Sequence, residues 1–205
     1  ERECLLLLRK FANTSYIFVP KPLDLVIYEK ISIIFIEWID LAQSQPNLLG
    51  KGLALLHKSS SEENNQNFGW EKEGFIGSNP QMKGWDSNWG EFFVNYRLRP
   101  QIIKASTWGV QVDDFEDVLI YLSSFLNNHS PEVSLVHGDL WSGNCGSTKK
   151  GIGSLYDPAS YWGDREVDIS MTRLFGGFNR EFYKGYEEIW PLDEFSKDRT
   201  EIYNL

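Results

Sequence analysis

The stretch LVHGDLWSGN, residues 135–144, decides the fold class of this sequence. Two branched apolar residues lead directly into His137 and Asp139, and Trp141 and Asn144 follow before a regular element can restart. An apolar run that stops at glycine and an acid is typical of a short strand that ends in a tight loop. The loop therefore gathers an acid, a large aromatic ring and an amide on one short segment.

A second short apolar run ends in Asp157, directly before a proline. If the runs at 135–137 and 154–156 are paired strands, Asp139, Asn144 and Asp157 surround one small volume at the same end of a sheet. Phosphoryl transfer requires a carboxylate that orients and deprotonates the attacking hydroxyl, and oxygen ligands for Mg²⁺. We assign the first task to Asp139 and the second to Asn144 and Asp157, since Mg²⁺ prefers hard oxygen donors.

The composition limits the class of protein. The 205 residues are 41% hydrophobic and 24% charged, which is ordinary for a soluble globular protein. No stretch reaches the roughly 18 to 20 apolar residues of a membrane helix, so we expect no membrane partner. The net charge of −9, with 29 acidic and 20 basic residues, disfavours nucleic acid as a partner.

The two cysteines, Cys4 and Cys145, lie far apart in the sequence and neither belongs to a CxxC pair. They predict neither a disulfide framework nor a structural zinc site. A reducing compartment fits this cysteine usage, and we expect a cytoplasmic protein. Whether a targeting segment precedes residue 1 stays an open question, because the chain begins with helically spaced apolar residues and without an initiator methionine.

The periodicity of apolar residues predicts a mixed order of elements. Helices are expected at 1–12, 46–59, about 90–105 and about 113–128, and again from Val167 onward. Strands are expected at 24–30 and 32–40, joined by a short turn, and in the stretches that contain LVHGD and SLYDP. Residues 60–90 are dense in Ser, Asn, Gly and Trp, which predicts a long irregular segment.

Three motifs together resemble the fructosamine kinases, also called ketosamine-3-kinases. They are HGDLWSGN at 137–144, YDPASYWGDRE at 156–166 and LFGGF at 174–178. This family is similar to the aminoglycoside phosphotransferases and choline kinases, and more distantly to protein kinases. The tryptophan after HGDL narrows the resemblance to the fructosamine kinase branch.

The resemblance covers nearly the whole chain and implies an α+β, protein kinase-like two-lobe fold. FIEWID at 35–40 resembles the hinge, and the sequence from 68 to 98 resembles the substrate-side insertion. Residues 1–40 would form part of the N-terminal lobe and the hinge, and 41–205 the C-terminal catalytic lobe, with an insertion at about 60–90 and its last helices clipped. The family's glycine-rich phosphate loop and strand lysine have no counterpart here and are expected upstream of residue 1.

The resemblance also implies nucleotide contacts. Glu1 falls where the family's helix glutamate pairs with the strand lysine, and Glu3 is the alternative after a two-residue slip. In a hinge, adenine is held by a backbone carbonyl and an amide two residues apart, which indicates Glu37 and Ile39. A simple buried strand at FIEWID is compatible with that interpretation.

The remaining candidates surround the loop. His137 is expected to hold backbone carbonyls, and Asp168 resembles the large-lobe acid that holds the catalytic loop from a neighbouring helix, so both are interpreted as structural. The flat ring of Trp141 could stack against the acceptor sugar. Most of the eight tryptophans are expected to be core residues.

The resemblance implies an ATP- and Mg²⁺-dependent kinase that phosphorylates the sugar 3-hydroxyl of ketosamines, both small molecules and glycated proteins. That phosphate destabilises the adduct and releases the amine, so the implied process is protein deglycation and repair. A related small-molecule hydroxyl kinase is an alternative, and a non-catalytic pseudokinase or binding module is another. Without a phosphate loop, residues 1–205 alone are expected to show negligible turnover.

Overall fold

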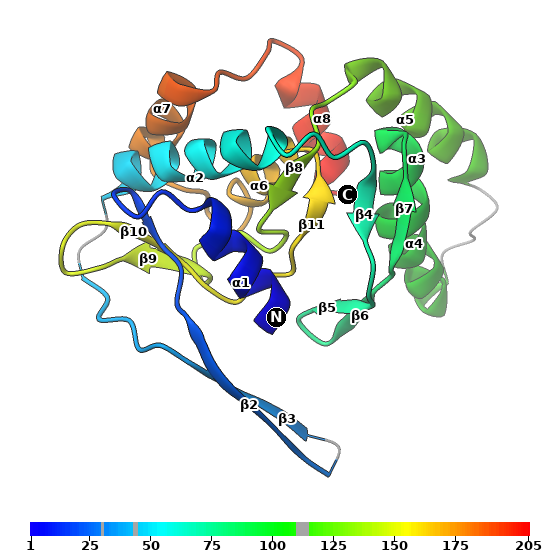
Figure 1. Cartoon of the computed structure of the whole chain (residues 1–205). Helices are drawn as coiled ribbons and strands as arrows, with labels where there is room; N and C mark the ends of the chain where they lie inside the picture. The colour runs from blue at the N-terminus through cyan, green and yellow to red at the C-terminus, as the bar shows by residue number, and fades with distance from the viewer. Residues whose placement is uncertain (30, 43–44, 110–114) are drawn as a thin grey trace.

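The structure is a computed structural model that describes residues 1–29, 31–42, 45–109 and 115–205. Its helices are α1 (Arg2–Phe11), α2 (Pro46–Ser61), α3 (Trp89–Phe93), the π-helix η1 (Val94–Leu98), α4 (Arg99–Ala105), the 3₁₀-helix η2 (Ser106–Trp108), α5 (Glu116–His129), α6 (Glu166–Met171), α7 (Arg180–Ile189) and α8 (Ser196–Tyr203) (Figure 1). Within these ranges, none of the helices combines the length and the apolar character needed to cross a membrane.

The strands form two small sheets and two hairpins. Their bounds are β1 (Ile17–Phe18), β2 (Pro22–Tyr28), β3 (Ile31–Ile36), β4 (Phe68–Trp70), β5 (Gly74–Ile76), β6 (Asn79–Gln81), β7 (Gly84–Asp86), β8 (Ser134–Val136), β9 (Cys145–Ser147), β10 (Gly153–Leu155) and β11 (Tyr161–Gly163). One sheet has the order β7-β4-β11-β8 and the other the order β1-β10-β9, while β2-β3 and β5-β6 are hairpins.

The predicted pairing of the runs at 135–137 and 154–156 is wrong. Strand β8 pairs with β11, and β10 pairs with β9 and β1, so the two runs lie in different sheets. The physical reason is proximity along the chain. Strand β9 begins directly after the loop and pairs antiparallel with β10, with Cys145 opposite Leu155. The YWG stretch forms β11, which pairs with β8. The sequence predicts no element there.

The predicted helices at the start of the chain and at 46–59 are confirmed as α1 and α2. Helix α2 crosses the middle of the molecule and packs along α7 (Figure 1). Its Leu49, Leu53 and Leu56 are buried in the main core cluster, as their helical spacing predicts. Glycine permits the close approach of α7, because a Cβ atom on Gly50 would lie 2.0 Å from the carbonyl oxygen of Phe182.

The other helical predictions hold with shifted bounds. The region 90–105 contains α3, η1 and α4, and the region after Val167 contains most of α6, all of α7 and α8. Helix α5 begins at Glu116. The predicted start at 113 lies outside the described residues.

The prediction of an irregular segment at 60–90 is only partly correct. This region contains strands β4 to β7, each of three residues. Strand β4 joins the four-stranded sheet because Phe68 and Gly69 pair with β7 on one side and Gly69 pairs with Trp162 of β11 on the other. Such short strands depend on distant partners, which local composition does not reveal.

The prediction that most tryptophans are core residues is wrong. Trp89 and Trp162 are buried, but Trp38, Trp85 and Trp108 are exposed. A second buried cluster surrounds Trp89 and contains residues of α3, α5, β8 and β11. Its members Phe93, Leu98, Tyr161 and Val167 line the same cavity as Asp139.

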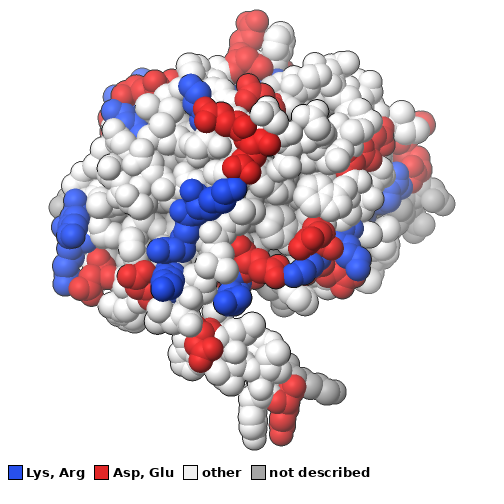
Figure 2. All heavy atoms as spheres, viewed as in Figure 1, with Lys and Arg blue, Asp and Glu red and all other residues white. Residues whose placement is uncertain are grey.

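Strands β2 and β3 confirm the predicted pair of strands with shifted bounds, because β2 spans Pro22–Tyr28 and β3 ends at Ile36 rather than at residue 40. The predicted end of the first strand at residue 30 lies outside the described residues. The two strands form an antiparallel hairpin that projects from the rest of the molecule (Figure 1). Large apolar side chains along it are exposed, among them Leu23, Ile27, Ile31 and Phe35. In Figure 2 the surface of this projection is mostly uncharged. The proposed lobe boundary at residue 40 stays a prediction.

Candidate active site

The loop after β8 is fixed by the buried ring of His137. Its Nε2 atom lies 3.0 Å from the carbonyl oxygen of Tyr156, and the amide of Asp139 donates to its Nδ1 at 3.3 Å. One ring nitrogen therefore donates while the other accepts, which is the pattern of a neutral imidazole. Burial lowers the pKa of His137, in agreement with a neutral ring. The side chain joins the loop to the strand end before Asp157.

Asp168 in α6 holds the backbone of the same loop. Its Oδ2 accepts from the amide of His137 at 2.7 Å, and its Oδ1 accepts from the amide of Gly138 at 2.9 Å. Oδ2 also lies 3.1 Å from Nε2 of His57, whose Nδ1 is 2.9 Å from the hydroxyl of Tyr186. Burial alone would raise the pKa of Asp168, but the hydrogen bond and charge of His57 outweigh it, and the pKa is lowered.

Gly138 allows the two loops to meet although their strands lie in different sheets. Its φ is +82°, and a Cβ atom there would lie 2.2 Å from the carbonyl oxygen of Ala159. The amide of Ala159 donates to the carbonyl of His137 at 2.9 Å, and the amide of Tyr156 donates to the carbonyl of Asn144 at 3.1 Å. These contacts bring together the three residues that sequence reasoning placed around one volume.

Asn144 connects the two predicted acids. Its Nδ2 donates to the carbonyl and the Oδ2 atom of Asp139, both at 2.9 Å, and approaches the carbonyl of Asp157 at 3.4 Å. Within the described ranges, the amide oxygen of Asn144 and the carboxylate of Asp157 accept no hydrogen bond from another residue. These two groups form a set of hard oxygen donors that fits Mg²⁺.

The carboxyl group of Asp139 is half-buried. Burial raises its pKa, and the charges of Asp157 and Asp168 act in the same direction, while the hydrogen bond from Asn144 acts against them. Asp157 itself has a φ of +55°, an uncommon conformation for a residue other than glycine. Strained backbone of this kind is concentrated at functional sites.

A cavity of about 650 Å³ opens in front of the loop. Asp139, Trp141, Asn144 and Asp157 all line it. The ring of Trp141 lies over Gly143, where a Cβ atom would approach it to 2.3 Å, and meets the ring of Phe175 edge to face at 5.7 Å between centroids. Trp141 is 36% exposed, so part of its ring is available to a ligand.

Glu1 lies outside this cavity, against a second one of about 370 Å³ that includes Pro158 and Ala159. Burial raises the pKa of the Glu1 side chain, and the negative charge of Asp157 adds to the effect. Glu3 forms an ion pair with Lys72 at 2.5 Å, so its carboxylate is already engaged. This difference favours Glu1 over Glu3 as the family's helix glutamate, and the assignment stays a prediction.

The hinge candidates line neither cavity. The amide of Glu37 donates to the carbonyl of Lys21 at 2.8 Å. The carbonyl of Glu37 and the amide of Ile39 form no hydrogen bond to any residue that the structure describes. These are the two groups assigned to adenine, and their availability is compatible with that assignment.

Several residues near the site were absent from the predicted set. His57 supports Asp168, and Arg97, Tyr161 and Phe175 line the cavity. His57 lies in the helix predicted at 46–59, Phe175 in the LFGGF motif, and Arg97 in the 68–98 stretch that resembles the substrate-side insertion. The sequence predicts no role for these residues, and only the structure places Arg97 and Phe175 at the cavity.

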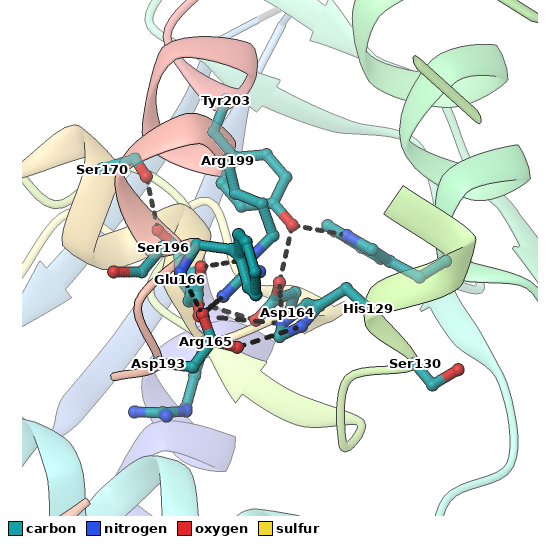
Figure 3. A network of polar contacts seen from close by, with 12 residues as sticks. His129, Ser130, Asp164, Arg165, Glu166, Ser170, Asp193, Ser196, Arg199 and Tyr203 are labelled. Carbon is teal, nitrogen blue, oxygen red and sulfur yellow. Dashed lines mark hydrogen bonds and ion pairs between the residues drawn. The ribbon is translucent and has the colours of Figure 1, made fainter. Parts of the chain in front are cut away.

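A polar network behind the cavity fixes α8 (Figure 3). Arg199 forms ion pairs with Glu166 at 2.7 Å and with Asp193 at 2.6 Å. Tyr203, which lines the cavity, donates its hydroxyl to Asp164 at 2.6 Å. Arg199 neutralises Glu166 and Asp193. We therefore interpret the network as structural, because it holds α8 in place at the wall of the cavity.

Comparisons with known proteins agree with this geometry. The model of the fructosamine kinase family matches residues 2–205. A probable ketoamine kinase of Vibrio parahaemolyticus is 39% identical over 209 residues, which cover 100% of this chain and 70% of that protein. A solved structure from Haemophilus somnus, provisionally named fructosamine-3-kinase, is 28% identical with a TM-score of 0.87, and the match covers 100% of this chain and 68% of that one.

The likeness in fold extends further. An ethanolamine kinase of Plasmodium vivax matches with a TM-score of 0.53 at 17% identity, over 99% of this chain and 59% of that one. At this identity the comparison concerns the fold alone. The mixed helices and strands described above are thus a fold that this chain shares with that protein. Together with the match over residues 2–205, these findings show that the chain belongs to the fructosamine kinase family.

Proposed function

We propose that this protein transfers the γ-phosphoryl group of ATP to the 3-hydroxyl of a ketosamine and so starts the removal of sugar adducts from protein amines. Membership of a kinase family implies ATP as the donor. The observation that carries the proposal is the convergence of Asp139, Asn144, Asp157 and Trp141 on one cavity. This set combines an acid, two oxygen ligands and an aromatic surface.

Asp139 would accept the proton of the attacking hydroxyl. Its raised pKa makes it a stronger base than an exposed aspartate, and Asn144 fixes the orientation of its carboxylate through a 2.9 Å hydrogen bond. The buried contacts of His137 and Asp168 hold the loop backbone beneath it. The base would therefore be positioned before the acceptor binds.

Asn144 and Asp157 would hold the Mg²⁺ that accompanies ATP. When bound, the ion neutralises charge on the phosphate oxygens. The amide oxygen of Asn144 and the carboxylate of Asp157 have no competing donors among the described residues. The amide group of Asn144 would serve both tasks, since its nitrogen donates to Asp139 and its oxygen would be free to bind the ion.

Trp141 would form the surface on which the acceptor sugar stacks. Its ring is supported by Gly143 beneath and by Phe175 at its edge, and it remains partly exposed. We expect Trp141→Ala in the full-length protein to raise the KM for ketosamine about tenfold while the KM for ATP stays nearly unchanged, since a stacked aromatic ring contributes roughly 0.5–1.5 kcal/mol beyond burial. Steady-state kinetics with each substrate varied in turn measures this. Equal losses for both substrates would contradict the stacking role.

The proposed function is tested by incubating the full-length protein with MgATP and fructosyl-, ribulosyl- or psicosyl-amines. We expect stoichiometric ADP formation, and ³¹P and ¹³C NMR should locate the phosphate on the 3-hydroxyl and detect release of the amine. The Asp139→Asn protein is the matched control. Binding of ketosamine and MgATP without transfer would favour a non-catalytic protein, and transfer only to unrelated alcohols would favour another small-molecule kinase.

A further inference from the structure

Arg97 lies in an unusual helical turn at the acceptor cavity. The chain from α3 to α4 is interrupted by the π-helix η1, Val94–Leu98, which includes Arg97. Single π-turns within helices are rare and are frequently found at functional sites. The turn brings Tyr96, Arg97 and Leu98 together to the wall of the cavity that also contains Asp139.

The guanidinium of Arg97 lacks a counter-charge among the described residues. Its Cζ atom stacks on the rings of Tyr161 at 4.2 Å and Phe92 at 4.8 Å. One terminal nitrogen, Nη1, donates to the carbonyls of Met82 at 3.0 Å and Tyr96 at 2.9 Å. No carboxylate of the described residues lies within ion-pair distance.

One nitrogen of this side chain remains without a partner among the described residues. It is Nε, which is buried and forms no hydrogen bond. Burial lowers the pKa of Arg97, and the neighbouring Tyr161 opposes this effect only in part. The side chain is half-buried. A partly buried charge without an opposing charge is unfavourable, and pairing with an anion would offset that cost.

The charges around the cavity are divided between its walls. Of the described residues that line it, Arg97 is the only one with a basic side chain, and Asp139 and Asp157 are the only ones with acidic side chains. The two acids come from the loops after β8 and β10, whereas Arg97 comes from the helical wall. The acceptor would therefore meet negative charge at its reacting hydroxyl and positive charge at another part of the molecule.

We propose that Arg97 is a specificity residue that binds an anionic oxygen of the acceptor. Resting on the proposed function, this inference defines the favoured substrate class as ketosamines that carry a carboxylate or a phosphate close to the sugar. The planar fork of a guanidinium can donate two parallel hydrogen bonds to two oxygens of either group. The carboxylate would come from an adduct of a free amino acid, and the phosphate from an adduct of a phosphorylated sugar.

The first test compares substrates on the unmodified full-length protein. The pair is the ribulosamine of glycine and the ribulosamine of glycinamide, which differ only in the carboxylate. We expect kcat/KM to be at least about tenfold higher for the carboxylate, as one charge-assisted hydrogen bond provides. A third arm uses a ribulosamine 5-phosphate. A kcat/KM higher for this substrate than for the other two would assign the site to phosphate. Equal kcat/KM values for all three substrates would overturn the inference while leaving the proposed function intact.

The second test uses variants. Arg97→Gln should reduce the ratio of kcat/KM between the carboxylate and the amide substrate to about one, whereas Arg97→Lys should keep part of the preference. Arg173→Gln is the matched control, because Arg173 also stacks on an aromatic ring, Tyr183, but is exposed and does not line the cavity. An equal loss on the charged and the neutral substrate would show that Arg97 only supports the wall. If no ketosamine is turned over, calorimetric binding of the same substrate pair decides the inference separately from the proposed reaction.

Discussion

At the scale of single residues, the protonation of Asp139 controls the proposed chemistry. Its carboxyl is half-buried beside Asp157 and Asp168, and burial raises its pKa above the ordinary value. A base with a raised pKa loses its charge earlier as the pH falls. We therefore expect activity to decline on acidification at a pH above the ordinary range of aspartate titration.

We expect Asp139→Asn to lower kcat by about 10²- to 10⁴-fold, the usual contribution of general-base assistance. The substitution keeps the shape of the side chain, so binding of MgATP should change little. Rate measurements between pH 4 and pH 8 should show the decline in activity at acidic pH in the parent, and no such decline in the variant. A variant that retains both the rate and the decline would exclude Asp139 as the base.

The second prediction at this scale concerns Gly138. A Cβ atom there meets the carbonyl oxygen of Ala159 at 2.2 Å, and the φ of +82° strains any other residue. Gly138→Ala should lower the free energy of unfolding by about 1–3 kcal/mol from the backbone alone, with the steric clash added. Gly109→Ala is the matched control, since Gly109 has a φ of +93° and open space around it. Urea denaturation measures both, and equal losses would contradict a tight contact between the two loops.

At the scale of secondary-structure elements, the network in Figure 3 joins α5, α6 and α8. His129, the last residue of α5, lies 3.3 Å from Asp164, 3.7 Å from Glu166 and 3.8 Å from Asp193. Arg199 and Tyr203 approach the same acids from α8. Burial opposes the charged form of His129, but the hydrogen bond and charge of Asp164 outweigh burial, and its pKa is raised.

A raised pKa in the folded state means that protonation of His129 favours folding. This stabilisation is fully present below the pKa of the unfolded chain, about 6.5, and is lost as the pH rises through the higher folded value. His129→Gln should therefore lower the free energy of unfolding by about 1 kcal/mol at pH 6, a typical value for a cation at a helix C-terminus, and by less at pH 9. Chemical denaturation at both pH values measures this. A difference between parent and variant that does not depend on pH would contradict it.

At the scale of the whole molecule, the β2-β3 hairpin projects from the rest of the structure and exposes large apolar side chains (Figure 1). Leu23, Ile27, Tyr28 and Ile31 are each more than 60% exposed. Contiguous exposed apolar surface of this kind promotes association. We expect residues 1–205 to self-associate as concentration rises.

Sedimentation velocity over a range of concentrations tests this expectation. Replacing Ile27 and Ile31 with lysine should shift the distribution toward monomer, because charge on a strand edge opposes pairing between chains. Asn64→Lys is the control, since Asn64 lies outside the hairpin and is exposed. A parent chain that stays monomeric at every concentration would contradict the prediction.

The local sequence was sufficient for the helices and for the chemistry of the loop. The spacing of Leu49, Leu53 and Leu56 predicts α2, because residues three and four apart share one face of a helix. The LVHGDLWSGN stretch contains an acid, an aromatic ring and an amide within one turn-rich segment. These residue types do not depend on which strand pairs with β8. These features depend on neighbours along the chain, so the sequence by itself determined them.

Only the tertiary structure decided which strands pair and which residues meet at the cavity. The pairing of β8 with β11 rather than β10, and the position of Arg97 at the cavity that Asp139 also lines, depend on contacts between distant segments. Strand pairing is selected by packing over the whole sheet, and a three-residue strand has too little pattern to specify its partner. The resemblance places Arg97 in the substrate-side insertion at 68–98, but the proposed role of its side chain depends on the absence of a nearby acid in space, which the local sequence does not reveal. The sequence therefore determined the reactive groups, and long-range packing determined their surroundings.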